Sequence, residues 1–209
     1  MKRLLAAAAV TTALAFSAGA SAQGYLGTSF GQSDFDLDCS GLTNCDTKDT
    51  GWKVFGGYMF TPNFGLEGAY VDFGKATGSA SSIPVILASD RVTRLVVTPP
   101  TLSGSGSLKA AGFGLWGVGA YPIGTGSVFG KLGFASIENK LEVTGTGGGF
   151  SASGSEKTTV TDFAYGIGGQ YFFTPNFGAR IEWERFQGKI PDDEKFDIDF
   201  ISAGLVYRF

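Results

Sequence analysis

Histidine is absent from this chain of 209 residues, which removes the usual general base of acyl-transfer and proteolytic sites. Serine is abundant, but a serine nucleophile is difficult to activate without a base. A nucleotide site lacks its signature too, because the run from Gly145 to Gly149 has no strand–turn–helix context. We predict a protein that is not an enzyme and has no catalytic residues and no cofactor.

Long apolar runs are scarce, and the one clear example lies at the start of the chain. Leu4 to Phe16 follows the basic pair Lys2 and Arg3 and precedes Ala20-Ser21-Ala22, small residues at the positions that a signal peptidase reads. A retained membrane anchor is disfavoured, because the apolar core is short and the cleavage site follows directly. We predict a signal peptide over residues 1–22 and an exported domain over residues 23–209.

Basic runs are missing as well. After loss of Lys2 and Arg3 with the signal, 14 basic residues face 19 acidic ones, a net charge of −5. This charge argues against nucleic acid as a partner. Cysteine occurs only at Cys39 and Cys45, a spacing that predicts a local disulfide in an exported chain. Two cysteines without histidine make a poor metal site, so we predict none.

What the chain does have is alternation. Outside the signal, hydrophobicity repeats every two residues rather than every 3.6, which predicts β-strands. Each predicted strand is long enough to cross a bilayer when tilted. The eight segments are 24–33, 51–60, 64–73, 108–121, 127–136, 160–173, 177–187 and 196–209.

The two faces of these strands differ in a way that suits a narrow barrel. In 160–173, Phe163, Ile167 and Tyr171 share one face, whereas Ala164 and Gly166 share the other. The second face is too small and glycine-rich for a solvated surface, but it fits the cramped lumen of about eight closed strands. Large residues are therefore expected on the outer face and small ones inside.

The connections alternate in length, as they do in outer-membrane barrels. Tight turns are predicted at 61–63, 122–126 and 174–176. Long polar loops are predicted at 34–50, 74–107 and 137–159, with a shorter one at 188–195. The apolar runs Ile83 to Leu87 and Leu95 to Val97 suggest a β-hairpin beyond the membrane. The predicted fold is all-β: an eight-stranded antiparallel up-and-down transmembrane β-barrel with short periplasmic turns and long extracellular loops.

Several motifs resemble the OmpA-type eight-stranded transmembrane domain of the OmpA/OmpX-like small barrels. Phe55-Gly56-Gly57-Tyr58 through Glu67 is similar to its second hairpin, and Tyr121-Pro122-Ile123 and 174–183 are similar to its later turns and strands. Leu205, Tyr207 and Phe209 resemble the C-terminal signal read by the barrel-assembly machinery. The resemblance implies location in the outer membrane. OmpA continues into a periplasmic peptidoglycan-binding domain that has no counterpart here, so a cell-wall tether is not expected.

Charged residues interrupt the strands at positions that alternation directs into the lumen. They are Lys53, Glu67, Lys131, Arg180, Glu182 and Glu184. Three positive and three negative side chains in a low-dielectric interior are expected to pair across it. The resemblance implies a salt-bridge gate at Glu67, Lys131 and Arg180, but two further positions where that family is polar read Val118 and Gln170. A structural plug is the favoured interpretation, and a small channel for ions or small solutes, gated or not, is the alternative.

The loops carry the remaining hypotheses. Loop 34–50 holds five aspartates that could bind a divalent cation, although such a run is more often simply a solvated acidic loop. Loops 74–107 and 137–159 could present an adhesin surface to a host or surface ligand. We expect a monomer that contributes to envelope structure or surface interaction, with outer-membrane lipid and lipopolysaccharide as partners and the barrel-assembly machinery acting during biogenesis.

Overall fold

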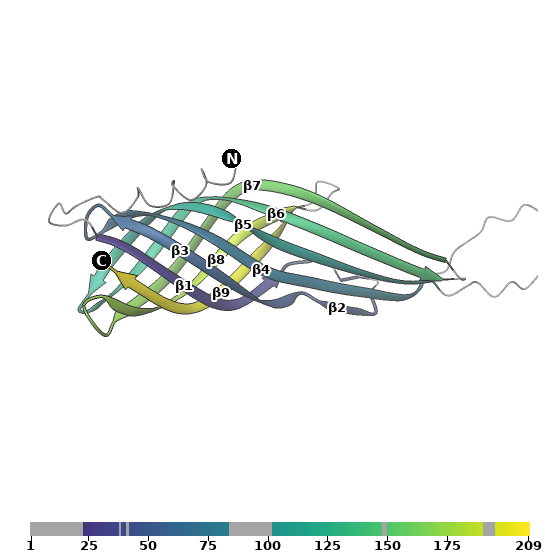
Figure 1. Cartoon of the computed structure of the whole chain (residues 1–209), viewed down its shortest axis with the longest axis horizontal. Helices are drawn as coiled ribbons and strands as arrows, with labels where there is room; N and C mark the ends of the chain where they lie inside the picture. The colour runs from purple at the N-terminus through teal and green to yellow at the C-terminus, as the bar shows by residue number, and fades with distance from the viewer. Residues whose placement is uncertain (1–22, 38, 41, 84–101, 148–149, 190–194) are drawn as a thin grey trace, which may run out of the picture.

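The computed structural model describes residues 23–37, 39–40, 42–83, 102–147, 150–189 and 195–209. These residues form antiparallel strands that wrap into a barrel (Figure 1). The strands are β1 (Gln23–Phe35), β2 (Asn44–Asp46), β3 (Lys48–Met59), β4 (Phe64–Ile83), β5 (Leu102–Ile123), β6 (Gly126–Gly147), β7 (Phe150–Phe172), β8 (Phe177–Lys189) and β9 (Lys195–Arg208). Across these ranges, no helix is long and apolar enough to cross a membrane.

Eight of the strands close a ring. β1 pairs with both β3 and β9, the strands from β3 to β9 pair in chain order, and every pairing is antiparallel. Closure removes the sheet edges that would otherwise leave backbone groups unpaired. The eight-stranded up-and-down barrel predicted from alternation is therefore confirmed. The short strand β2 stands outside the ring and pairs only with Thr77–Ser79 of β4 among the described residues.

Alternation places side chains as the sequence indicates for β7. Ile167 and Tyr171 are 60% and 61% exposed on the outside of the barrel, whereas Ala164 is buried inside. Large apolar side chains form a continuous outer band on all eight ring strands, and a band of this kind faces lipid in membrane barrels. Its members include Leu26, Val54, Leu66, Phe113, Leu115, Leu132, Phe134, Ile181, Ile201 and Leu205.

One turn chemistry is used twice at the end of the barrel that carries the short connections. Thr61 Oγ1 accepts a hydrogen bond from the Phe64 backbone, and Thr174 Oγ1 accepts one from the Phe177 backbone. Asn63 then donates its side-chain amide to Ala120 O on the neighbouring strand, and Asn176 does the same to Arg208 O. Each Thr-Pro-Asn turn thus ties its own hairpin to the next one.

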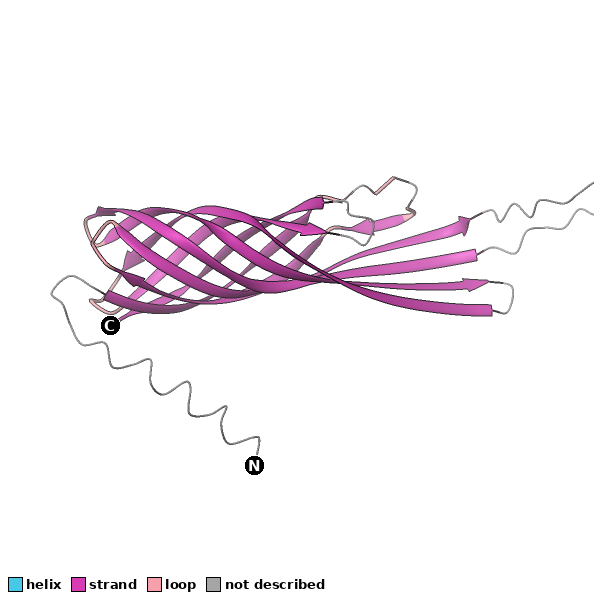
Figure 2. Cartoon of the chain, turned by 90° about the horizontal axis from the view of Figure 1, so that it is seen from above, coloured by secondary structure: helices cyan, strands magenta, loops and turns pink. Residues whose placement is uncertain are grey.

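Four strands continue beyond the ring at the opposite end, where long polar loops were predicted (Figures 1 and 2). Pairing of β4 with β3 ends at Asp72, and pairing of β7 with β8 ends at Tyr165. β4, β5, β6 and β7 go on pairing with one another as a four-stranded sheet over 75–83, 102–109, 138–147 and 150–160, called the extension below.

The predicted bounds of these four strands are therefore too short, because each strand continues into the parts of 74–107 and 137–159 that were predicted as long polar loops. The physical reason is that the ring already pairs each of these strands with its neighbours. The hydrogen bonds of the extension lengthen an existing ladder and need no separate nucleation step. Most of the predicted hairpin at 83–97 lies outside the described residues.

Candidate functional site: the barrel interior

The inward side chains of the barrel form two layers stacked along its axis. On β8, the residues Arg180, Glu182 and Glu184 come first from the short-turn end, and Phe186 follows toward the extension. The six predicted lumen charges make up the first layer, called the charge layer. Phe73, Trp116, Phe186 and Phe200 make up the second, called the aromatic layer.

The charge layer draws its members from four strands and buries all of them. Lys53 lies on β3, Glu67 on β4, Lys131 on β6 and the remaining three on β8. None of the six is more than 4% exposed. Burial of this kind is tolerable only if every charge has opposite charges and hydrogen bonds around it.

Glu67 occupies one side of the charge layer. It receives a bidentate pair of hydrogen bonds from Arg180, at 2.6 Å to Nη1 and 3.0 Å to Nη2. Lys131 Nζ lies 3.0 Å from the same carboxylate, and the Tyr25 hydroxyl donates to it at 2.9 Å. Four hydrogen bonds from three side chains therefore satisfy both oxygens of this buried carboxylate.

Glu182 and Glu184 complete the charge layer on the other side. Lys53 forms ion pairs with both carboxylates. Lys131 lies 3.0 Å from Glu182 and 2.5 Å from Glu184, and Arg180 lies 2.8 Å from Glu182. Each cation therefore contacts at least two carboxylates and each carboxylate at least two cations. The layer has no net charge, and its six side chains are linked by ion pairs. Removal of one side chain therefore leaves its neighbours with an unpaired charge in a buried site.

Aromatic rings enclose the cations. Arg180 stacks between Phe55 and Phe129, with its guanidinium carbon 4.3 and 4.2 Å from the two ring centroids. Lys131 lies 4.7 Å from the centroid of Trp116. Contacts of this type stabilise a cation where water is excluded. They also join the charge layer to the aromatic layer above it.

The aromatic layer is packed edge to face and fully buried. The ring of Phe73 lies 4.8 Å from that of Phe186 and 5.8 Å from that of Phe200, and Trp116 lies 6.0 Å from Phe186. All four side chains are at most 1% exposed. Phe35, Ile137 and Ile198 continue the apolar packing toward the extension.

This layer was not predicted from the sequence, because large residues were expected only on the outer face. The signal was present: Phe73, Trp116, Phe186 and Phe200 lie an even number of residues from inward positions on their own strands. Alternation predicts whether a side chain points into the barrel or out of it. The level along the barrel axis at which side chains of different strands meet depends on the register between the strands. Glycines beside the rings create the space, as at Gly114 two residues before Trp116 on β5, where a Cβ would overlap the indole.

The two positions that depart from the family pattern lie on the short-turn side. Val118 is buried and contributes no hydrogen-bonding group. Gln170 donates to Ser127 Oγ at 3.0 Å, within a polar vestibule of about 760 Å³. Neither offers an alternative partner to Glu67 or Arg180, which a switching gate would need.

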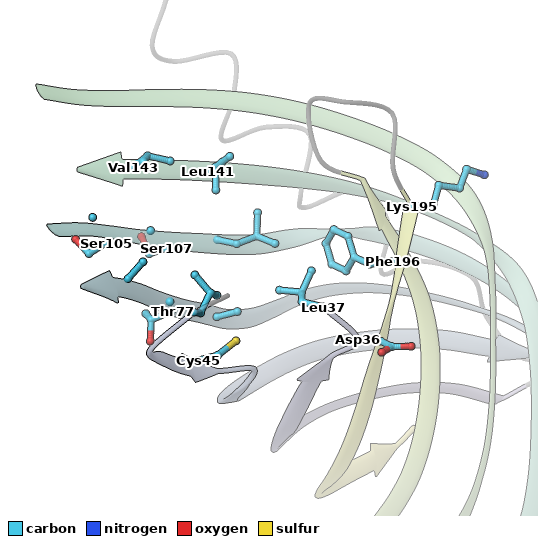
Figure 3. A pocket seen from close by; sticks show the side chains of 17 residues that line it. Asp36, Leu37, Cys45, Thr77, Ser105, Ser107, Leu141, Val143, Lys195 and Phe196 are labelled. Carbon is cyan, nitrogen blue, oxygen red and sulfur yellow. The ribbon is translucent and has the colours of Figure 1, made fainter. Parts of the chain in front are cut away.

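A groove of about 450 Å³ opens above the sealed core, on the inner face of the extension (Figure 3). Leu37 and Phe196 lie at its inner end, and Leu141 and Val143 lie on the wall formed by β6. Cys45 closes one side. The disulfide predicted between Cys39 and Cys45 is present, with 6.0 Å between the two Cα atoms.

The described aspartates of segment 34–50 have separate partners. Asp34 pairs with Lys48 at 3.2 Å, Asp46 accepts from the Lys48 backbone, and Asp49 accepts from the Lys75 backbone. Across the part of the chain that the structure describes, no group of three or more acidic, cysteine or histidine residues is placed to hold a metal ion.

The terminal residues Leu205, Tyr207 and Phe209 point outward at the short-turn end. Leu205 and Phe209 are each 58% exposed, and the ring of Tyr207 lies 5.1 Å from that of Phe209 and 4.8 Å from that of Phe177.

Comparison with known families identifies the group to which this barrel belongs. The family described as "Outer membrane protein beta-barrel domain" matches residues 4–209. The chain belongs to this family. It is therefore an outer-membrane protein, and the expectation of an OmpA-like small barrel in that location is confirmed. Its short-turn end faces the periplasm, and the extension faces the exterior. No curated protein sequence matches the chain.

Solved structures resemble the chain at low identity. Ail, the attachment invasion locus protein of Yersinia pestis, was crystallised with the heparin analogue sucrose octasulfate. It is 19% identical with a TM-score of 0.50, over 90% of this chain and 99% of that one. The N-terminal barrel of OprF from Pseudomonas aeruginosa is 14% identical with a TM-score of 0.47, over 89% and 97% of the two chains. Neisserial surface protein A is 11% identical with a TM-score of 0.40, over 90% and 97%.

Proposed function

We propose that the protein is a non-enzymatic, sealed barrel that contributes to envelope structure and carries a surface platform. The observation that supports the seal best is the aromatic layer. A charge layer alone could rearrange to admit ions, but beyond it Phe73, Trp116, Phe186 and Phe200, from four different strands, pack against one another as fully buried rings. Ions lose their hydration in an apolar constriction at a high cost in free energy.

Planar-bilayer recording tests the seal. Refolded protein of residues 23–209 is expected to give no steady conductance at moderate voltage. The alternative function, a small channel, predicts discrete openings in the wild type that disappear in Glu67→Ala or Arg180→Ala. Such openings would overturn the proposal of a plugged lumen.

A second function, surface interaction, is favoured by the lysines of the extension. Lys75, Lys109, Lys140 and Lys157 stand opposite one another in one register row across β4 to β7. Lys140 pairs with Glu142 at 2.5 Å, and Lys157 pairs with Glu138 at 2.7 Å. Neither Lys75 nor Lys109 forms an ion pair with a described carboxylate, and like charges directly opposite one another weaken a sheet.

This row suits anionic groups outside the cell, in lipopolysaccharide or in a sulfated glycan. Binding of immobilised heparin by cells that display the protein is expected to fall in the double variant Lys75→Gln/Lys109→Gln. Deletion of residues 74–107, which removes Lys75 together with the outer parts of β4 and β5, is expected to abolish binding while the barrel still assembles. Unchanged binding in both variants would contradict an adhesin role for this face.

The proposal extends to export of the protein and its assembly into the outer membrane. The signal peptide 1–22 directs export and is removed, and the barrel-assembly machinery then recognises the strand that ends in Leu205, Tyr207 and Phe209. The outward exposure of these side chains supports such recognition. Mass spectrometry of the outer-membrane protein is expected to show Gln23 as its first residue, and Phe209→Ser is expected to lower its level in that membrane.

A further inference from the structure

The outer face of the barrel changes from apolar to charged where the ring passes into the extension (Figure 2). On β5, the outward positions from Tyr121 to Phe113 carry no charge. The next two outward positions are Ala111 and Lys109. On β4, Tyr70 stands opposite Phe113, with 4.8 Å between the two ring centroids. Because aromatic side chains gather at membrane interfaces, this pair marks the outer limit of the lipid-facing band on these strands.

A hollow of about 770 Å³ lies across this limit, on the outward face. Three successive register rows line it. The row nearest the band holds the rings of Tyr70 and Phe113, and the row nearest the extension holds Lys75 and Lys109. Between them lies Ala111, whose short side chain leaves the space open. The hollow therefore has an aromatic end toward the lipid and a cationic end toward the exterior.

The carboxylates that line the hollow already have partners within the protein. Asp49 and Asp72 accept hydrogen bonds from backbone amides. Glu138 pairs with a lysine of β7 at 2.7 Å. Lys75 and Lys109 stand directly opposite each other, and neither forms an ion pair with a described carboxylate. Like charges in opposite positions weaken a sheet, so an anion between these two ammonium groups would stabilise it.

The two unpaired lysines lie close to the level of lipid headgroups. Lys109 is four residues from Phe113 along β5, which is about 13 Å along the strand and about 10 Å along the normal of the membrane when the strand is tilted. The headgroups extend about 5–8 Å beyond the hydrocarbon core. A lysine stem is long and flexible enough to bring its ammonium group back to that layer.

We propose that the hollow binds lipopolysaccharide of the outer leaflet through a phosphate on its lipid part. The phosphate lies between Lys75 and Lys109, and an acyl chain follows Phe113 and Tyr70 into the bilayer. This inference rests on the proposed surface role of the lysine row and narrows its anionic partner to a phosphate carried by a lipid. A sulfated glycan or a free phosphate ester has no chain with which to contact the aromatic end.

The probes are diphosphorylated lipid A, the same lipid with both phosphates removed, and soluble glucosamine 1-phosphate. Protein of residues 23–209, labelled with ¹⁵N and held in phosphatidylcholine nanodiscs, is titrated with each. Wild-type protein is expected to show saturable shifts of the backbone amides of Lys109 and Ala111 with the phosphorylated lipid. The dephosphorylated lipid is expected to bind about ten- to thirtyfold more weakly, because it lacks the contacts with two lysines. The soluble ester is expected not to saturate the site.

Three variants locate the site. Lys75→Gln/Lys109→Gln is expected to bind the phosphorylated lipid as weakly as the wild type binds the dephosphorylated one. Ala111→Leu fills the middle of the hollow and is expected to weaken both lipids. Lys48→Gln/Lys195→Gln is the matched control. It removes two positive charges from the same end of the barrel, at lysines that lie outside the hollow and have carboxylate partners of their own, and it is expected to bind as the wild type does.

Equal binding of the two lipids by the wild type would overturn the phosphate contact. Wild-type affinity in Ala111→Leu, or an equal loss in the control variant, would overturn the hollow as the site. Binding of glucosamine 1-phosphate as tight as that of the lipid would show a site for free phosphate esters and overturn the lipid as its partner.

Heparin binding by cells that display Lys75→Gln/Lys109→Gln separates this inference from the proposed surface role. A fall in heparin binding with unchanged affinity for lipid A would overturn the lipid site and leave the surface role standing. Unchanged heparin binding with a loss of affinity for lipid A would overturn the surface role alone.

Discussion

Strands β4 to β7 pass through two environments, and their inward residues differ accordingly. Within the ring, the inward positions carry charges and large aromatic rings that are fully buried, such as Glu67, Trp116 and Lys131. In the extension, the inward positions of the same strands carry Gly78, Gly106 and other small or aliphatic residues around an open groove. Closure of the ring makes the difference, because facing strands supply counter-charges for the inward charged side chains.

The comparison shows why the charges belong to the barrel and not to the groove. A charge inside the ring reaches counter-charges on strands opposite it, as Glu67 on β4 reaches Arg180 on β8. An open four-stranded sheet has no opposite wall of this kind. Matched substitutions in the two regions should therefore differ in their effects on stability.

The largest difference is expected between two acidic residues. Glu67→Ala leaves Arg180 and Lys131 short of a carboxylate in a buried site and is expected to lower the free energy of unfolding by about 3–5 kcal/mol. Glu142→Ala in the extension removes only an exposed pair with Lys140, and no measurable change is expected. Urea titration of the refolded barrel, followed by migration of unboiled samples on detergent gels, measures both. Equal midpoints for the two variants would contradict the comparison.

Truncation of inward apolar residues is expected to have the next largest effect. Trp116→Ala would open a cavity between the two layers and cost about 3–5 kcal/mol. Leu141→Ala removes a side chain that is only partly buried in the groove, so a smaller shift of the urea midpoint is expected. If Leu141→Ala were the more damaging of the two, the extension and not the ring would hold the main core.

Glycine substitutions sharpen the comparison further. At Gly166, an added Cβ would lie 2.9 Å from Glu184 Cγ and 2.8 Å from Trp183 O, so Gly166→Ala is expected to cost about 1–3 kcal/mol. At Gly106 the nearest atom would be 3.7 Å away, and Gly106→Ala is expected to be nearly neutral. Thermal unfolding followed by circular dichroism distinguishes the two, and a neutral Gly166→Ala would show that the charge layer is loosely packed.

The smallest effect on the barrel is expected from the disulfide. Cys39→Ser/Cys45→Ser removes a short covalent loop outside the ring, so the unfolding midpoint of the barrel should not change. Limited proteolysis is expected to cut the variant faster than the wild type within residues 37–46. A large loss of barrel stability would mean that this segment supports the ring.

The eight-stranded barrel could be predicted from the sequence, and so could the inward or outward direction of most side chains. Both follow from period-two alternation, which depends only on neighbours along one strand. It also indicated which charges would point inward. Alternation could not show that Glu67 and Arg180 meet, since they lie on strands that are not adjacent in the ring; only the family resemblance implied their salt bridge. The extension was not predicted, because segments rich in glycine, serine and threonine show little alternation of hydrophobicity. In such segments the sequence pattern does not distinguish a strand from a loop.

The central claim is that the aromatic layer seals the lumen without help from the charges. Planar-bilayer recording of Glu67→Ala/Arg180→Ala tests it most directly, because this pair removes one negative and one positive charge and leaves the remaining four balanced. The refolded double variant is expected to remain silent, with Phe73, Trp116, Phe186 and Phe200 still in place. Steady openings that are absent from the wild type would show that the charge layer is the seal.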